Sequence, residues 1–99
     1  NTFQNQQIET IVQKGHIQPV SVIEWHPSGN YFASGSLDHS IILWDYQTGK
    51  QIRSFNHHTG KIIDLEFSVD GKQLLASGSD NMVSIIDCEL GEVIFNYSY

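Results

Sequence analysis

The fold is decided by the stretch ASGSLDHSIILWD at residues 33–45, which holds two short strand-forming runs separated by turn residues. Asp38 and His39 stand between the runs, and aspartate is among the residues that make tight turns. All four residues of 41–44 are apolar, as a strand covered on both faces requires. The stretch therefore predicts a β-hairpin whose second strand is buried on both sides.

The same features return 42 residues later. The identical pairs at this offset are His16 and His58, Glu24 and Glu66, Gly29 and Gly71, Asp38 and Asp80, Asp45 and Asp87, Gly49 and Gly91, and Ile52 and Ile94. The later stretch ASGSDNMVSIID at residues 76–87 repeats its first four letters at an offset of 43, so we expect its first strand to be slipped by one residue. Such periodicity indicates stacked units that bury a core together.

Each unit contains four strand-forming runs. In the first unit they are residues 20–25, 31–36, 41–44 and 51–55, with turn residues between them at 27–30, 37–39 and 47–50. The second unit has turn residues at 69–72, 80–81 and 89–92. The chain is thus predicted to be all-β, with two antiparallel four-stranded meanders.

The first strand of each unit changes the parity of its apolar residues. Val20, Ile23 and Trp25 are spaced three and then two residues apart, and Ile62, Leu65 and Phe67 repeat this spacing. Because side chains alternate faces along a strand, the change of parity predicts a β-bulge in both strands.

Charge, hydropathy and cysteine content exclude several classes of protein. The net charge is −6 with five scattered Lys and Arg, so we expect no direct nucleic-acid partner. No apolar run approaches the ~20 residues of a membrane span, so no membrane contact is expected. Cys88 is the single cysteine, which excludes an internal disulfide. Residues 1–7 lack the pattern of a signal peptide. We expect an intracellular, cytoplasmic protein, with the nucleus left open.

Several of these residues together resemble the WD40 repeat family. They are Gly15-His16, Trp25-His26-Pro27, residues 33–38 and residues 41–45, followed more loosely by the second unit. The resemblance implies repeats at residues 15–56 and 57–99, with a polar leader and the outer strand of a preceding blade in residues 1–14. It also implies two blades of a β-propeller, as a fragment of a larger or composite ring, since propellers typically have four to eight blades.

The resemblance further implies a buried hydrogen-bonded network. In the first repeat it would join His16, Ser34 or Ser36, Asp38 and Trp44, because a buried carboxylate and a buried indole N–H both need partners. In the second repeat His58 and Asp80 are present, but Ile86 stands where Trp would be and Ser77 and Ser79 are out of phase. There we expect a His58–Asp80 pair, apolar packing in place of the indole, and an incomplete network.

Catalytic and metal sites are the competing interpretations. His16, Asp38 and a nearby serine have the composition of a hydrolase triad, but no nucleophile elbow accompanies them. His57 and His58 with Cys88 suggest a metal site, but adjacent strand residues point to opposite faces. His26 and His39 are expected to be solvated turn residues. We predict no catalysis, no metal and no cofactor.

The predicted function is a non-catalytic protein–protein interaction scaffold within a multi-subunit complex. Its partners would be proteins or peptides, with further WD40 blades in cis or in trans to close the ring. Family resemblance places the candidate binding face at Pro19, Ser21, Leu37, His39, Lys61, Ile63, Ser79 and Asn81. Short phrases resemble the WD40 regulatory subunit of katanin and centriolar WD40 proteins, which suggests a cytoskeletal or ciliary complex. The alternatives are a ribosome or RNA-processing assembly, and the substrate-recognition domain of an enzyme such as a ubiquitin ligase.

Overall fold

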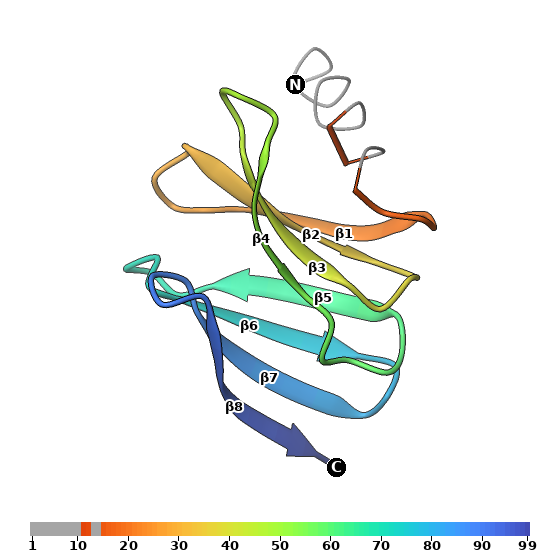
Figure 1. Cartoon of the computed structure of the whole chain (residues 1–99). Coiled ribbons are helices and arrows are strands. Elements are labelled where there is room, and N and C mark those ends of the chain that lie inside the picture. The colour runs from red at the N-terminus through yellow and green to blue at the C-terminus, as the bar shows by residue number, and fades with distance from the viewer. Residues whose placement is uncertain (1–10, 13–14) are drawn as a thin grey trace.

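The computed structural model describes residues 11–12 and 15–99, and these residues form two four-stranded sheets (Figure 1). The first sheet contains β1 (Val20–Trp25), β2 (Tyr31–Ser36), β3 (Ile41–Asp45) and β4 (Gln51–Phe55). The second sheet contains β5 (Ile62–Phe67), β6 (Gln73–Gly78), β7 (Met82–Asp87) and β8 (Glu92–Ser98). The predicted all-β meander is confirmed.

Neighbouring strands are antiparallel in both sheets and follow one another in chain order. Tight turns make this order possible, since the chain reverses within a few residues between strands. Positive φ angles occur in these turns at Gly29, Gly49, Gly71 and Gly91, and also at His39 and Asn81. The last two match each other at the 42-residue offset.

The bulges predicted in the first strand of each unit are confirmed. The pairing of β1 with β2 shifts between Val20 and Val22, and the pairing of β5 with β6 shifts between Ile62 and Asp64. The bulge turns Val20, Ile23 and Trp25 to one face of the first sheet.

The expected slip of β6 is wrong. Ile62 pairs with Gly78 as Val20 pairs with Ser36, so the 42-residue register holds through the second sheet. The repeated four-letter motif instead lies one position later within the strand, which places Ala76 where the first sheet has Ser34.

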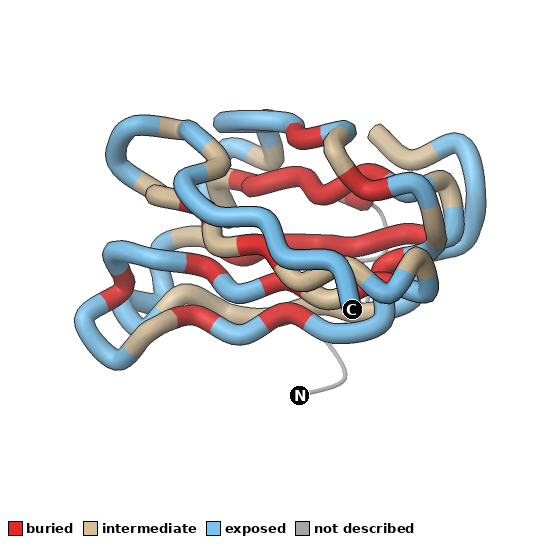
Figure 2. The backbone as a smooth tube through the Cα atoms, turned by 90° about the horizontal axis from the view of Figure 1, so that it is seen from below, coloured by how far each residue is buried: buried red, intermediate tan, exposed pale blue. Residues whose placement is uncertain are grey.

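The two sheets pack face to face around a shared core. The first sheet contributes Ala33, Ile41, Leu43 and Phe55, and the second contributes Ile62, Leu65, Phe67, Leu74, Ala76 and Ile86. Residues 41–44 of β3 are all buried, as their sequence predicted. Figure 2 shows the buried stretches inside the layered structure, whereas the chain approaching the C-terminus is exposed.

The other face of the first sheet has its own apolar cluster. Phe32, Ile42 and Trp44 are buried there together with Val12 from the segment before β1. The outer strand expected in this leader lies mostly outside the described residues. Ile11 and Val12, which are described, are helical, so the expectation is wrong for these two residues. The Val12 carbonyl accepts hydrogen bonds from the N–H groups of Gly15 and His16, which closes a turn in place of a strand ladder.

His26 joins the two sheets, which corrects the expectation of a solvated turn histidine. Its ring stacks on Tyr31 at a centroid distance of 4.0 Å and meets the edge of Phe67 at 5.0 Å. Its Nε2 lies 2.8 Å from the carbonyl oxygen of Gly71 in the β5–β6 turn. Aromatic neighbours from both sheets thus flank this half-buried histidine.

Gly35 sets how closely the sheets approach. A Cβ at this position would lie 2.5 Å from Cγ2 and 2.7 Å from Cβ of Ile62 across the interface. We expect Gly35→Ala to lower the free energy of unfolding by roughly 1–3 kcal/mol, because overpacking forces the backbones apart. Chemical denaturation measures this value, with Ser54→Ala at an exposed position of β4 as the control. Equal stability of the two variants would contradict this packing.

Candidate functional site

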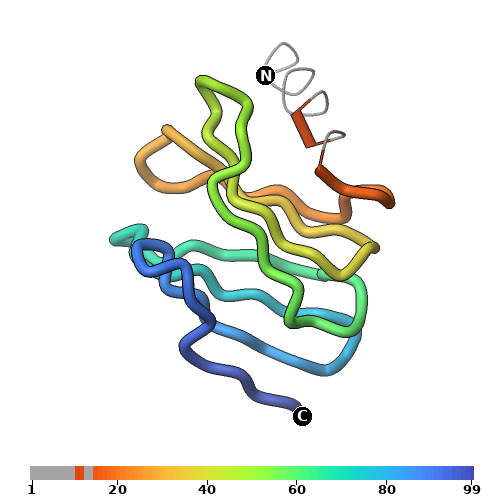
Figure 3. The backbone as a smooth tube through the Cα atoms, viewed as in Figure 1, coloured from red at the N-terminus to blue at the C-terminus, as the bar shows by residue number. Residues whose placement is uncertain are grey.

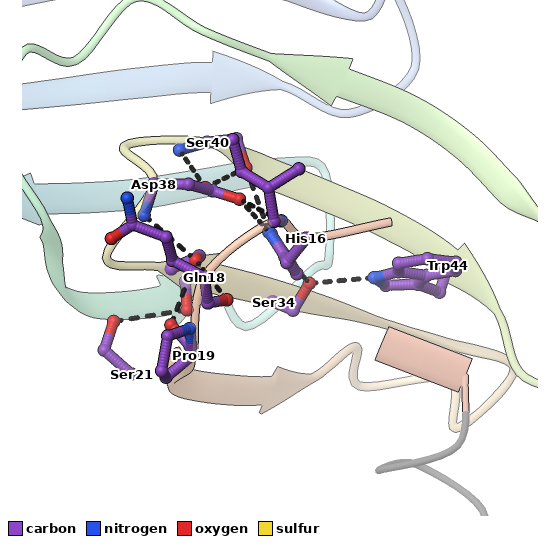
Figure 4. Close-up of polar contacts among 11 residues, drawn as sticks. His16, Gln18, Pro19, Ser21, Ser34, Asp38, Ser40 and Trp44 are labelled. Atoms are coloured by element: carbon purple, nitrogen blue, oxygen red, sulfur yellow. Dashed lines mark hydrogen bonds and ion pairs between the residues drawn. The ribbon is translucent and has the colours of Figure 1, made fainter. Parts of the chain in front are cut away.

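A buried network connects the loop before β1 to β2, the β2–β3 turn and β3 (Figure 4). His16 Nε2 lies 2.6 Å from Ser34 Oγ, and Trp44 Nε1 donates to the same hydroxyl at 2.8 Å. On the other side of the ring, His16 Nδ1 lies 3.2 Å from Asp38 Oδ2 and 2.9 Å from Ser40 Oγ. These five residues are called the first network below.

One neutral tautomer of His16 satisfies the first network. With the proton on Nδ1, the imidazole donates towards Asp38 and accepts from the Ser34 hydroxyl through Nε2. Ser34 Oγ then accepts the indole N–H of Trp44, so donors and acceptors alternate without conflict. Ser34 and Trp44 are at most 1% exposed, and a buried network with every member paired is rigid.

Asp38 is the acceptor at the other end of the first network. It accepts hydrogen bonds from the backbone N–H groups of Ile17 and Ser40 and from the Ser40 hydroxyl. Burial opposes ionisation, but these hydrogen bonds together with His16 outweigh it and lower the pKa of Asp38 to about 2. The carboxylate therefore holds the entry loop, which precedes β1, against the β2–β3 turn.

The structure brings together all four side chains expected in the first network and adds Ser40. Ser34 takes the hydroxyl position, whereas Ser36 donates to the carbonyls of Gln18 and Pro19 instead. Sequence reasoning missed Ser40, although it lies two residues after Asp38, and aspartate side chains in turns commonly accept a hydrogen bond from the backbone N–H two residues on. This two-residue spacing is the sequence feature from which the role of Ser40 could have been predicted.

The second sheet contains a corresponding network built from different residues. His58 Nδ1 lies 3.0 Å from Asp80 Oδ2, and its Nε2 lies 3.0 Å from Ser84 Oγ on β7. His57 Nε2 lies 2.8 Å from the same hydroxyl. His57, His58, Asp80 and Ser84 are called the second network below. The expected His58–Asp80 pair and the buried apolar Ile86 are both present.

The second network has more members than the sequence led us to expect. Ala76 and Ser84 are paired across β6 and β7 as Ser34 and Ile42 are paired across β2 and β3. The hydroxyl has therefore moved to the facing strand, and it still reaches the histidine. The sequence comparison missed Ser84 because it compared positions along the chain and not across the sheet. The network is nevertheless not fully paired, since the buried Nδ1 of His57 has no hydrogen-bond partner among the described residues.

Asp80 is held in the same way as Asp38. Burial opposes its ionisation, but the backbone N–H groups of Thr59 and Met82 and the neighbouring His58 lower its pKa below the ordinary range. Each carboxylate thus stays charged and connects the turn before the third strand of its sheet to the loop that enters the sheet.

The geometry of the first network does not suit a hydrolase. Ser34 Oγ is buried and already bonded to both His16 and Trp44, so no substrate carbonyl can reach it. Among residues 11–12 and 15–99, no group of three or more His, Cys, Asp and Glu side chains converges as a metal site would require. Burial raises the pKa of the Cys88 thiol to about 11, which leaves it protonated.

The eight candidate binding residues are all exposed, and one backbone hydrogen bond in each sheet joins two of them. The Pro19 carbonyl accepts from the Leu37 N–H, and the Lys61 carbonyl accepts from the Ser79 N–H. The Ser21 hydroxyl contacts the carbonyls of Gly35 and Ile62, so it connects the sheets at their seam. Ser21 is therefore occupied in a structural contact, unlike its neighbours on this edge.

A family model of the WD domain, G-beta repeat, matches residues 6–45 and 49–87. The chain belongs to the WD40 repeat family. Each sheet is therefore a WD40 blade, and the first network and the His58–Asp80 pair occupy the loop, turn and strand positions that the family resemblance implied. Domains of this family serve in general as non-catalytic interaction modules.

Curated relatives cover nearly the whole chain. One of the subunits of mouse chromatin assembly factor 1 is 29% identical over 96 residues, which is 95% of this chain and 17% of that protein. COMPASS component SWD3 of Saccharomyces cerevisiae is 28% identical and covers 86% of this chain and 27% of its own length. Pre-mRNA-splicing factor cwf17 of Schizosaccharomyces pombe is 37% identical, over 81% of this chain and 24% of its own length. The chain thus spans between 17% and 27% of these three proteins.

Solved structures show the same fold. The structure of U3-55K aligns with a TM-score of 0.81 at 19% identity and covers 86% of this chain and 28% of that one. The β-propeller domain of Cps50 (Swd1) from Myceliophteria thermophila aligns with a TM-score of 0.80 at 23% identity, over 85% of this chain and 26% of its own. Among the described residues, no helix is long and apolar enough to cross a membrane.

Removing the Ser34 hydroxyl should destabilise the first WD40 blade. Ser34→Ala leaves the Trp44 N–H and His16 Nε2 buried without their shared partner, at a cost of roughly 1–3 kcal/mol in the free energy of unfolding. Thermal or chemical denaturation measures the loss. The matched control is again Ser54→Ala at an exposed strand position, and similar stability of both variants would show that the network contributes nothing.

Asp38 should make the stability of the protein depend on pH in the acid range. Because its pKa is lowered from 3.8 to about 2, its contribution is fully present above pH 4 and is lost as the pH falls through this interval. The pKa difference corresponds to about 2 kcal/mol. Denaturation of wild type and Asp38→Asn at several pH values should show a stability gap that narrows towards pH 2. A gap that does not change with pH would contradict the assignment.

Proposed function

We propose that this chain is part of a WD40 propeller that serves as a non-catalytic scaffold for protein–protein interactions within a multi-subunit complex. The observation that carries the proposal is the position of the two networks. Each ties a blade's entry loop to the β2–β3 or β6–β7 turn, and these rigid loops present the exposed residues of one edge. A prearranged surface loses less conformational entropy when a partner binds.

The candidate binding face consists of the exposed residues on this edge. Leu37 is 38% exposed and Ile63 is 55% exposed, and Lys61 supplies a positive charge between the two blades. His39 and Asn81 occupy equivalent left-handed turn positions, so their side chains are presented alike in both blades. Such a mixture of apolar and polar groups suits a peptide or protein surface.

A further WD40 blade is the proposed partner of the outer face of the second sheet. That face carries Leu75, Val83, Ile85, Phe95 and Tyr97, which are linked by cross-strand pairing. Leu75, Phe95 and Tyr97 are between 42% and 57% exposed. In the first sheet the residues equivalent to Leu75, Val83, Ile85 and Tyr97 are buried against the second sheet; they are Ala33, Ile41, Leu43 and Phe55. The equivalent of Phe95 is the exposed Arg53. The contact between the two sheets supports the proposal that a further blade, in cis or in trans, covers this face.

The names of the relatives favour some of the candidate complexes over others. They include a component of a chromatin assembly factor, a COMPASS component and a pre-mRNA-splicing factor. We therefore place an RNA-processing or chromatin-associated assembly ahead of the cytoskeletal or ciliary complex, which stays a prediction. The same names leave a ubiquitin-ligase adaptor without support. With a net charge of −6, contacts through proteins are favoured over contacts with the phosphate backbone.

The candidate face can be tested with charge-matched variants. Leu37→Asp with Lys61→Glu alters the binding edge, and Val69→Asp with Lys72→Glu makes the same charge change in the β5–β6 turn at the opposite edge. We expect the first pair to reduce co-purification of the native complex at least about tenfold, as loss of a hot spot would, and the second pair to leave it unchanged. Co-purification should also survive nuclease treatment. Full retention by the first pair, with its melting temperature unaltered, would exclude this face.

A further inference from the structure

His57 occupies the position in the second sheet that Gly15 occupies in the first. Gly15 precedes His16, and His57 precedes His58, at the same 42-residue offset. A Cβ on Gly15 would lie 2.6 Å from Cη2 and 2.8 Å from Cζ2 of Trp44, so the indole fills the space beside this glycine. In the second sheet Ile86 replaces the tryptophan, and its shorter side chain leaves room for a side chain at position 57.

His57 also reproduces the hydrogen bond of the missing indole. Trp44 Nε1 lies 2.8 Å from Ser34 Oγ, and His57 Nε2 lies 2.8 Å from Ser84 Oγ. In both networks the hydroxyl also contacts Nε2 of the buried histidine, which is His16 in the first and His58 in the second. The exchange therefore involves three coordinated positions: the glycine, the tryptophan and the serine.

We infer that His57 is the functional substitute for the network tryptophan, and that it adds to the second network a proton-responsive group at the position where the first network has an indole. An indole N–H only donates, and it does not titrate. An imidazole has a second nitrogen and gains a proton near neutral pH. The second network thus contains a titratable group at the position where the first contains an inert one.

The surroundings of His57 disfavour its protonated form. Nδ1 is buried and has no hydrogen-bond partner among the described residues, so an added N–H there would be left unsatisfied. β4 presents the uncharged Phe55 ring at a centroid distance of 6.4 Å, and β7 presents the Ser84 hydroxyl. The titratable neighbours are His58, with its ring centroid 4.6 Å away, and Asp80 in the β6–β7 turn.

These neighbours determine the direction of the pH response. Burial first, and then the neighbouring His58, lower the pKa of His57 below 6.5, and Asp80 only partly opposes them. When the pKa of a histidine is lower in the folded state than in the unfolded state, protonation favours the unfolded state. The free energy of unfolding is therefore unaffected above pH 6.5 and decreases as the pH falls below that value. Mild acid should therefore weaken the second network before it affects Asp38 in the first.

The location of His57 gives this response a structural consequence. It lies in residues 56–61, the connection through which the chain passes from β4 of the first sheet to β5 of the second (Figure 3). Protonation would set a charged imidazole against Ser84 and beside Phe55 of the shared core. We expect the link between the two blades, and the binding edge that crosses it, to loosen in mild acid.

The inference can be tested by NMR of the His57 side chain in the intact protein between pH 7.5 and 5. The side-chain nitrogen shifts of His57 should show titration below the ordinary histidine value. Over the same range, amide hydrogen exchange corrected for its intrinsic pH dependence should become severalfold faster at Thr59 and Ser84, with Ser34 and Ser40 unchanged. Titration of His57 at its ordinary value or above would overturn the inference without any variant.

Two variants isolate the role of His57. His57→Gln keeps a donor at the Nε2 position and removes the titration, so the acid-induced exchange at Thr59 should disappear, whereas the exposed control His39→Gln should retain it. His57→Gly with Ala76→Ser, Ser84→Ile and Ile86→Trp places the residue types of the first sheet at all four equivalent positions and should likewise abolish the response. Persistence of the acid response in either folded variant would show that another group causes it.

Discussion

Each sheet depends on a buried histidine that is held between a carboxylate and a hydroxyl. His16 lies between Asp38 and Ser34, and His58 lies between Asp80 and Ser84, with the histidine and aspartate side chains of both pairs at most 6% exposed. A buried carboxylate is tolerated only when donors surround it, so the turn that holds the aspartate must stay against the entry loop. This constraint fixes the loops at one edge of each sheet and leaves their outward side chains free to contact a partner.

The two networks show which parts of this arrangement can be exchanged. The histidine and aspartate keep their positions in both sheets, because together they join segments that are 22 residues apart. The hydroxyl and the second N–H donor change position: Ser34 and Trp44 give way to Ser84 and His57. What is retained is a donor directed at a hydroxyl that contacts imidazole Nε2, and both the indole of Trp44 and the imidazole of His57 supply this donor. The cost of an unpaired buried group explains why these changes occur together.

The two sheets have equivalent apolar faces, but these faces are covered by different elements. One face of the first sheet is buried by the second sheet, and its other face is covered in part by Val12. The outer face of the second sheet has the same apolar character without a cover among the described residues. Large exposed apolar faces are usual where another element docks. The rigid edge loops support the proposed interaction surface, and the uncovered apolar face supports the proposed contact with a further blade.

Local sequence determined the strands, the turns and both β1 and β5 bulges. These features depend on alternation, turn chemistry and a 42-residue repeat, which can all be recognised along one chain. The His–Asp pairs were implied by the family resemblance. Only the tertiary structure decided the role of Ser84, because the hydroxyl lies on the strand facing Ala76 and a cross-strand partner is set by register. It also decided that His57 fills the space of an absent indole, that His26 bridges the sheets, and that Ile11 and Val12 are not in a strand. Each of these depends on which side chains meet in space, and that is fixed only when the two sheets pack.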